Sequence, residues 1–190
     1  MSDTIITTNE VRISYANIYE PKSINGSEAK YGTSILFNKM DAVIRMKIED
    51  AVAAAVAVGK QKYGNNFDKG KFHTPLRDGD EERPDDEAYK GMLFLNANSK
   101  NKPRIYDKSA KVVDEKDFVY SGCYVRCILS FYPYSFNGNK GVSVSLGDIQ
   151  KLRDGERLGG MPSGQSVFKD EEKKDPFAGV EDDDGDEMFG

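Results

Sequence analysis

The chain has 190 residues, of which 38% are hydrophobic and 31% charged, with a formal net charge of −5. This length is enough for one domain with a sizeable core. The N-terminal residues lack the basic region and apolar stretch of a signal peptide, and no apolar run approaches the roughly 18 residues of a membrane span. The two cysteines fit a reducing cytoplasm, and a single histidine argues against a His-based triad or multi-His metal site.

The charge is unevenly distributed along the chain. Residues 169–190 carry ten acidic and three basic residues, a net charge of −7, and residues 78–87 carry seven acidic residues and one Arg. The remainder has 23 basic and 15 acidic residues, a net charge of +8. The acidic average therefore hides a basic body that is compatible with a polyanionic partner.

The first half of the chain predicts two strands and one helix. Val11, Ile13 and Tyr15 alternate with polar or small residues, the period of a half-buried strand, and residues 31–37 form a second strand candidate. Apolar residues then recur at every fourth position: Ile44, Ile48, Val52 and Val56. This period predicts a helix from Asp41 to about residue 58.

The boundaries of that helix are predicted from side chains at its two ends. Asn38 or Asp41 can supply the N-cap, and Gly59 can end the helix.

The second half of the chain predicts three further strands. They lie at residues 92–97, 118–136 and 142–146, and Asn137-Gly138-Asn139 joins the last two as a hairpin. Five strands and one helix favour a mainly β fold, a small barrel or sandwich with elaborated loops. We expect residues 1–168 to form the domain and residues 169–190, which have too few apolar residues for a core, to be a disordered acidic tail.

The aromatic segment 118–136 has two different faces when it is read as a strand. One face is apolar and predicts core, and its two cysteines are expected to be buried free thiols. The other face carries Tyr120, Tyr124, Arg126, Tyr132 and Tyr134. Exposed rings beside an arginine are typical of a surface on which unstacked bases stack, although a loop or the helix could instead cover this face.

Basic and aromatic residues near the predicted strands are candidates for contacts with a nucleic-acid backbone. They are Lys30, Lys39, Lys100, Lys102, Arg104, Tyr106 and Lys140. For each single lysine, the alternative is an ordinary solvated surface position.

The acidic segments allow other interpretations. The carboxylates of residues 78–87 could bind Mg²⁺ in a nuclease, although adjacent acids in a Gly- and Pro-containing loop are usually solvated. The tail ends in acids and an aromatic residue, a pattern that could compete with DNA for a basic groove or dock into a partner, or could only solubilise the chain. Its candidate residues are Asp182, Asp183, Asp184, Asp186, Glu187 and Phe189.

Several motifs together resemble a known family. They are NANSKNKP (96–103), RDGD (77–80), GCYVRCILSFYPY (122–134), GNKG (138–141) and RDGERLGG (153–160). They are similar to bacteriophage single-stranded DNA-binding proteins, once catalogued as a domain of unknown function, and the resemblance covers roughly residues 11–168.

This resemblance implies an OB-fold, a five-stranded oligonucleotide-binding barrel, with one amphipathic helix and long loops. An OB barrel usually has its helix after the third strand, whereas here the helix follows the second predicted strand, so either a short strand is missed or the topology is modified.

The resemblance also implies a function. It implies non-enzymatic, sequence-independent binding of single-stranded DNA in phage replication, recombination and repair, without a cofactor or metal, in the cytoplasm of the infected host. The tail would recruit phage or host replication and recombination proteins. The alternatives are a metal-dependent nuclease and a purely protein-binding module or virion component.

Overall fold

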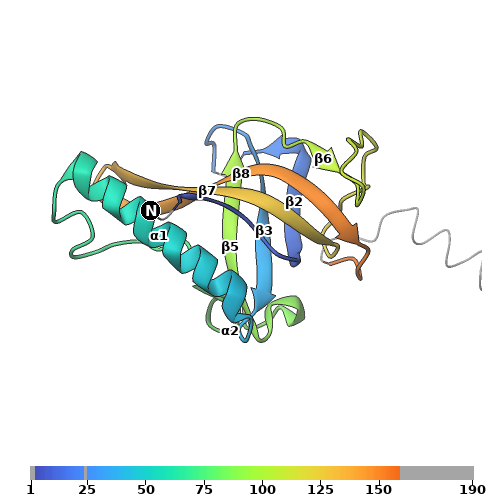
Figure 1. Ribbon diagram of the computed structural model, residues 1–190, viewed down its shortest axis with the longest axis horizontal. Helices are drawn as coiled ribbons and strands as arrows, with labels where there is room; N and C mark the ends of the chain where they lie inside the picture. Colours follow the sequence, from blue (N-terminus) through green and yellow to red (C-terminus); the bar gives the residue numbers. More distant parts are fainter. Residues whose placement is uncertain (1–2, 24, 159–190) are drawn as a thin grey trace, which may run out of the picture. The chain divides into compact units, whose positions relative to one another are not determined.

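The computed structural model describes residues 3–23 and 25–158, and their fold is a closed β-barrel (Figure 1). Its five main strands are β2 (Val11–Lys22), β3 (Lys30–Asn38), β5 (Met92–Ser99), β7 (Tyr124–Phe136) and β8 (Asn139–Arg153). Antiparallel pairings join β2 to β3, β3 to β5, β7 to β8 and β2 to β7, and a parallel β5–β8 pairing closes the ring. This is an OB-like barrel, as the sequence predicts.

Shorter elements extend the barrel wall. Strand β1 (Ile5–Thr7) pairs with β7, β4 (Arg77–Asp78) with β5, and β6 (Ile105–Tyr106) with β8. The helical elements are α1 (Ala42–Tyr63), the short α2 (Gly79–Glu82) and the 3₁₀ turn η1 (Glu87–Tyr89). Among the described residues no helix is both long and apolar enough to cross a membrane.

Helix α1 lies between β3 and β5 in the chain, so it follows the second main strand of the barrel. A short strand, β1, was missed before the helix, but it only extends the barrel wall. The topology of the main strands is modified from the usual OB arrangement. In Figure 1, α1 runs beside the long β7–β8 hairpin, with which it makes most of its contacts.

The core lies inside the barrel and between the barrel and α1. Alternate residues of the strands point inward, and the helix contributes the buried stripe Ile44, Ile48, Ala51, Ala55 and Gly59. The predicted apolar residues Val52 and Val56 are only partly buried, because the stripe shifts to the alanines after Ile48. Part of the opposite side of α1 is also apolar and exposed, between charged residues near the two ends of the helix.

The start of α1 is predicted correctly and its end is not. The Asp41 carboxylate accepts from the Ile44 amide at 3.3 Å, which makes Asp41 the N-cap. The helix continues through Gly59 to Tyr63 and ends at Gly64, whose φ of 104° is in the region that favours glycine. Gly59 is instead a packing position, because a Cβ there would lie 2.3 Å from the ring of Phe67.

The β7–β8 hairpin is confirmed, with Asn137 (φ 50°) and Gly138 (φ 79°) as its two-residue turn. Strand β7 begins at Tyr124, however, and residues 118–123 form no strand. Gly122 explains the break, because its φ is 113° and a Cβ there would lie 2.0 Å from the Glu156 carbonyl oxygen. Cys123 and Cys127 are buried free thiols, as predicted.

Candidate nucleic-acid interface

Strand β7 separates its side chains between the core and the outer surface, as its alternation predicts. Val125, Cys127, Leu129 and Phe131 point into the core. The outward residues are only partly covered: Tyr124 and Tyr134 are half-buried, and Arg126, Ile128 and Tyr132 are exposed.

The hairpin end of this outer surface gathers several rings around an open pocket. Tyr134 and Phe136 line a cavity of about 360 Å³ together with His73, Arg77 and Asn139. Phe136 is 73% exposed and Tyr132, one outward position before Tyr134, is 44% exposed. We call Tyr132, Tyr134 and Phe136 the hairpin rings. Their exposed apolar surface at the end of the strand is available to a ligand.

Small polar residues form the adjacent outer wall. The strand pairings place Tyr132 opposite Ser143, Asn98 beside both Gly32 and Ser145, and Ser34 opposite Asn96. The Ser34 hydroxyl and the Asn96 side chain are hydrogen-bonded to each other. At Gly32 a Cβ would lie 2.3 Å from Asn98 Oδ1, so a side chain there would disturb this wall. Asn96 and Asn98 are exposed and Ser143 and Ser145 are half-buried, whereas Ser34 is buried. The two asparagines and the two serines of β8 are therefore the hydrogen-bonding groups that this wall offers.

Tyr124 lies at the opposite end of β7, and its ring is already occupied. The guanidinium of Arg153 is 3.7 Å from the ring centroid and that of Arg12 is 5.5 Å away. Glu10 Oε2 accepts from Arg153 at 2.7 Å, and this carboxylate raises the pKa of Arg153. A base can stack on Tyr124 only where these arginines leave part of the ring free.

Tyr120 does not share the outer face of β7. Its hydroxyl donates to Asp154 Oδ1 at 2.9 Å, and its ring lies between the cationic groups of Lys151 and Arg157, 5.0 and 4.2 Å from the centroid. Burial is the main cause of the raised pKa of this phenol. The expectation that Tyr120 continues the strand face is wrong, because the chain leaves the strand period at Gly122.

Two predicted residues contact the Asp148 carboxylate, and a third lines the same cavity. Arg104 Nη2 lies 3.4 Å from Asp148 Oδ2, to which the hydroxyl of Tyr106 donates at 3.4 Å. Arg126 lines the same cavity of about 280 Å³ as Tyr106 and Asp148, with Ile128 in its wall. This group lies on the outer surface of β6, β7 and β8.

The predicted lysines are dispersed over the molecule. Lys30 begins β3 opposite Lys22, and Lys100 and Lys102 follow β5, whose last residue Ser99 pairs with Tyr31, so these lysines share one end of the barrel. Lys100 Nζ is 3.5 Å from a Glu28 carboxylate oxygen, and Lys102 Nζ is 5.8 Å from the Tyr19 ring centroid. Lys140, in the hairpin, donates to the Asn66 carbonyl at 3.1 Å.

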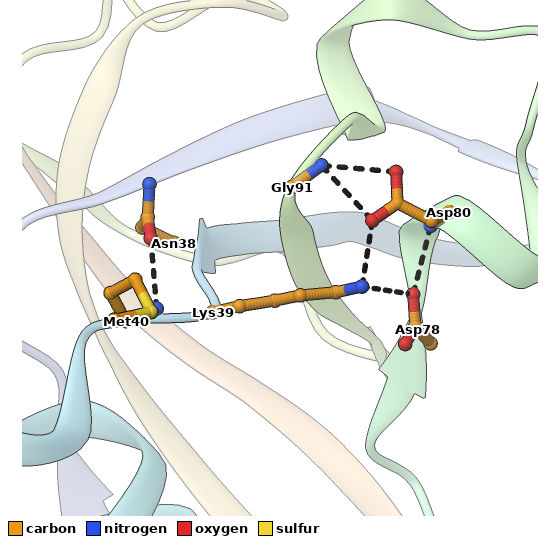
Figure 2. A network of polar contacts seen from close by, with 6 residues as sticks. All are labelled: Asn38, Lys39, Met40, Asp78, Asp80 and Gly91. Carbon is orange, nitrogen blue, oxygen red and sulfur yellow. Dashed lines mark hydrogen bonds and ion pairs between the residues drawn. The ribbon is translucent and has the colours of Figure 1, made fainter.

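Lys39 lies at the far end of β3 and is held by the acidic segment (Figure 2). Its ammonium group is 2.8 Å from Asp78 Oδ1 and 2.6 Å from Asp80 Oδ2, and Asp80 also accepts from the Gly91 amide. These contacts raise the pKa of Lys39 and lower the pKa of both aspartates. The pairing connects Asp78 and Asp80 of the acidic segment to the end of β3.

The acidic segment is folded rather than simply solvated. It forms β4, α2 and η1, capped by the side chains of Asp78 and Asp86. Within residues 3–23 and 25–158, no group of three or more His, Cys, Asp or Glu residues is arranged to hold a metal ion. The carboxylates of Asp78 and Asp80 serve as partners for Lys39 and for backbone amides.

One cluster of aromatic and cationic residues was missed by sequence reasoning. Arg83, the single basic residue of the acidic segment, lies 5.2, 5.6 and 5.8 Å from the rings of Tyr15, Tyr89 and Phe94. Tyr15 was expected to face the core, but its φ of 50° at an irregularity of β2 turns it outward, where it is 52% exposed. The one sequence feature that could have indicated this cluster is Arg83 itself, a single basic residue within an acidic segment.

Known proteins resemble this chain in sequence and in fold. A family model described as the Enterobacter phage Enc34 ssDNA-binding protein matches residues 4–178. A putative protein p50 of Acyrthosiphon pisum secondary endosymbiont phage 1 is 35% identical over 166 residues, 82% of this chain and 86% of the relative.

Two solved structures share the fold. The single-stranded DNA-binding protein of bacteriophage Enc34, in complex with ssDNA, matches with a TM-score of 0.70 and 20% identity over 82% of this chain and 90% of that one. The single-stranded DNA-binding protein gp2.5 of bacteriophage T7 matches with a TM-score of 0.56 and 15% identity over 86% and 99% of the two chains. The family match spans most of the chain, and the protein belongs to the Enc34-type family of phage ssDNA-binding proteins.

Proposed function

We propose that this protein binds single-stranded DNA on the outer surface of its barrel, without sequence preference and without catalysing a reaction. The observation that carries the proposal is the group of hairpin rings, of which Tyr132 and Phe136 are exposed and Tyr134 is half-buried, beside small polar residues and an open pocket containing Arg77. The family supports the same function. An alternative nuclease function has no comparable support, because Asp78 and Asp80 are paired with Lys39 and no group of carboxylates among the described residues is arranged to hold a metal ion.

The hairpin rings, the polar wall and the basic residues would each contact a different part of the DNA. Bases would stack on the hairpin rings, since each base–aromatic contact contributes about 1–3 kcal/mol whatever the base. The polar wall would accept or donate hydrogen bonds, and Arg77, Lys30, Lys100 and Lys102 would contact phosphates. Non-specific binding follows because stacking and phosphate contacts do not read base edges.

The first test is to remove single rings. Tyr132→Ala and Tyr134→Ala should each weaken binding to a short oligonucleotide by about 5- to 150-fold, the range that 1–3 kcal/mol implies. Tyr132→Phe keeps the ring and should bind normally. Val112→Ala removes an apolar side chain of similar exposure, 58%, from another part of the surface and serves as the control. Unchanged affinity in both alanine variants, measured by fluorescence anisotropy, would sink this assignment.

Tyr124→Ala should have a smaller effect than the hairpin substitutions, because Arg153 already covers the ring of Tyr124 at 3.7 Å. Arg126→Ala and Arg104→Ala test the Asp148 region in the same titrations. Binding should also fall steeply with salt, because phosphate contacts release counterions. A salt-independent affinity would instead indicate a protein-binding module.

We further propose that binding serves phage DNA replication, recombination and repair in the cytoplasm of the infected cell. The acidic tail, whose residues lie outside the described part of the chain, would compete with DNA and recruit replication or recombination proteins. Deleting residues 169–190 removes a net charge of −7, so it should tighten DNA binding. A weaker complex after the deletion would reject the competitor role.

Labelled DNA incubated with the protein and Mg²⁺ or Mn²⁺ should keep its length; shortening would support the nuclease.

A further inference from the structure

Helix α1 exposes an apolar face that the rest of the described chain does not cover. Residues 51–59 contain no polar side chain, yet only Ala51, Ala55 and Gly59 among them are buried. On the outer side Ala53 and Ala57 are exposed, and Val43, Met46 and Val58 are 56, 61 and 45% exposed. A helix that is apolar on nearly all sides normally has a partner on each of them.

The charges at the two ends of this face are of opposite sign. Asp50 precedes the apolar stretch, and Lys60 follows it on the same side of the helix. Asp50 has no ion pair among the described residues, whereas Lys60 pairs with Asp68 at 3.2 Å on the helix flank. A helix with an acid at one end of an apolar face and a base at the other complements an antiparallel copy of itself.

We propose that the outer face of α1 binds the α1 helix of a second copy of this chain, antiparallel, about a two-fold axis that meets the outer face between Ala53 and Ala57, at the level of Ala55. Residues equidistant from Ala55 then lie opposite each other: Asp50 meets Lys60 of the other copy twice, and Ala53 meets Ala57. Small residues at the crossing let the two helices approach to about 8 Å. Because the interface is two-fold, it closes after two copies and gives dimers rather than filaments.

The same register accommodates the largest exposed side chain of the face. Met46 falls opposite Gly64, where no side chain is present and a Cβ would find no atom within 4 Å. The helix has 22 residues and is therefore about 33 Å long, so pairing along its length covers the exposed apolar residues from Met46 to Val58. This dimer leaves the hairpin rings to DNA, because they belong to β7 and not to the outer side of α1.

A charge-swap experiment tests the pairing directly. Sedimentation velocity of the full chain without DNA should show a concentration-dependent monomer–dimer equilibrium. Asp50→Lys and Lys60→Glu should each weaken dimerisation at least about tenfold, since like charges then face each other. An equimolar mixture of the two variants should dimerise again, because the mixed dimer has opposite charges at both contacts, one pair with reversed sign and one as in the wild type. Wild-type protein that stays monomeric at every concentration would overturn the proposal.

Two further variants separate pairing from folding. Ala57→Arg places a large charge at the proposed crossing and should abolish the dimer, whereas Val112→Arg adds the same charge at an exposed apolar position away from the helix and should not. Circular dichroism checks that each variant folds. A dimer that persists in folded Ala57→Arg, or a mixture of folded charge variants that stays monomeric, rejects the α1 interface. The measurement contains no DNA, so its outcome is independent of the proposed DNA binding.

Discussion

Gly59 tests whether packing, rather than helix propensity, decides this position of α1. Replacing a helical glycine with alanine normally stabilises a protein by about 1 kcal/mol. At Gly59, however, a Cβ would lie 2.3, 2.5 and 2.9 Å from three atoms of the Phe67 ring. Phe67 is only 3% exposed and its ring contacts Tyr63 and Phe72, each with centroids 5.3 Å away, so it cannot easily move. Overpacking of this kind costs about 1–3 kcal/mol, and a rigid ring favours the upper value.

The net effect of Gly59→Ala is then a loss of about 2 kcal/mol, which lowers the melting temperature of a chain of this size by about 4–8 °C. Thermal unfolding followed by circular dichroism measures it. In a Phe67→Ala background all three of these ring atoms are gone, and Gly59→Ala should become neutral or stabilising. Exposed position 62 serves as the propensity control, and Lys62→Gly should be about 1 kcal/mol less stable than Lys62→Ala. A higher melting temperature for Gly59→Ala in the wild-type background would refute the packing argument.

Three other predictions follow from the contacts of single side chains. Lys39 lowers the pKa of Asp78 and Asp80, so its stabilising effect is present above the ordinary aspartate pKa and is lost as pH falls through the lowered values. The difference in melting temperature between wild type and Lys39→Met should therefore shrink below about pH 4, and a constant difference contradicts this. Burial raises the pKa of the Cys127 thiol to about 12 and also raises that of Cys123, so both should react with iodoacetamide at pH 8 only after unfolding; rapid native-state labelling, seen by mass spectrometry, excludes this. Tyr120→Phe loses the hydroxyl contacts to Asp154 and Gly155, so it should lower the free energy of unfolding by about 1 kcal/mol in denaturant titrations. Its DNA affinity should be unchanged, and weaker DNA binding would show that Tyr120 belongs to the interface.

Features set by neighbouring residues could be predicted from the sequence. The N-cap at Asp41 and the turn at Asn137-Gly138 depend on short-range hydrogen bonds and dihedral angles, and both are where the pattern placed them. The predicted end of α1 at Gly59 was wrong, because a glycine is required there by the close contact with Phe67, a residue beyond the helix, and not by the end of the helix. The partner of Lys39 was equally invisible, since the loop that carries Asp78 and Asp80 reaches β3 only through the tertiary fold.

The candidate interface shows a different limit of the same reasoning. Alternation along a strand predicts which side chains point out of the barrel, but it does not predict toward which part of the molecular surface each of them points. Strand β7 has 13 residues and is about 40 Å long, and it pairs with β2 at Tyr124 and Val125 but with β1 at Leu129 and its neighbours. Because the strands of a closed barrel tilt and twist, the outward normal turns along such a strand. Tyr124 and Tyr134 are therefore both outward without lining one groove, which is why the alanine variants at these two positions should affect DNA binding to different extents.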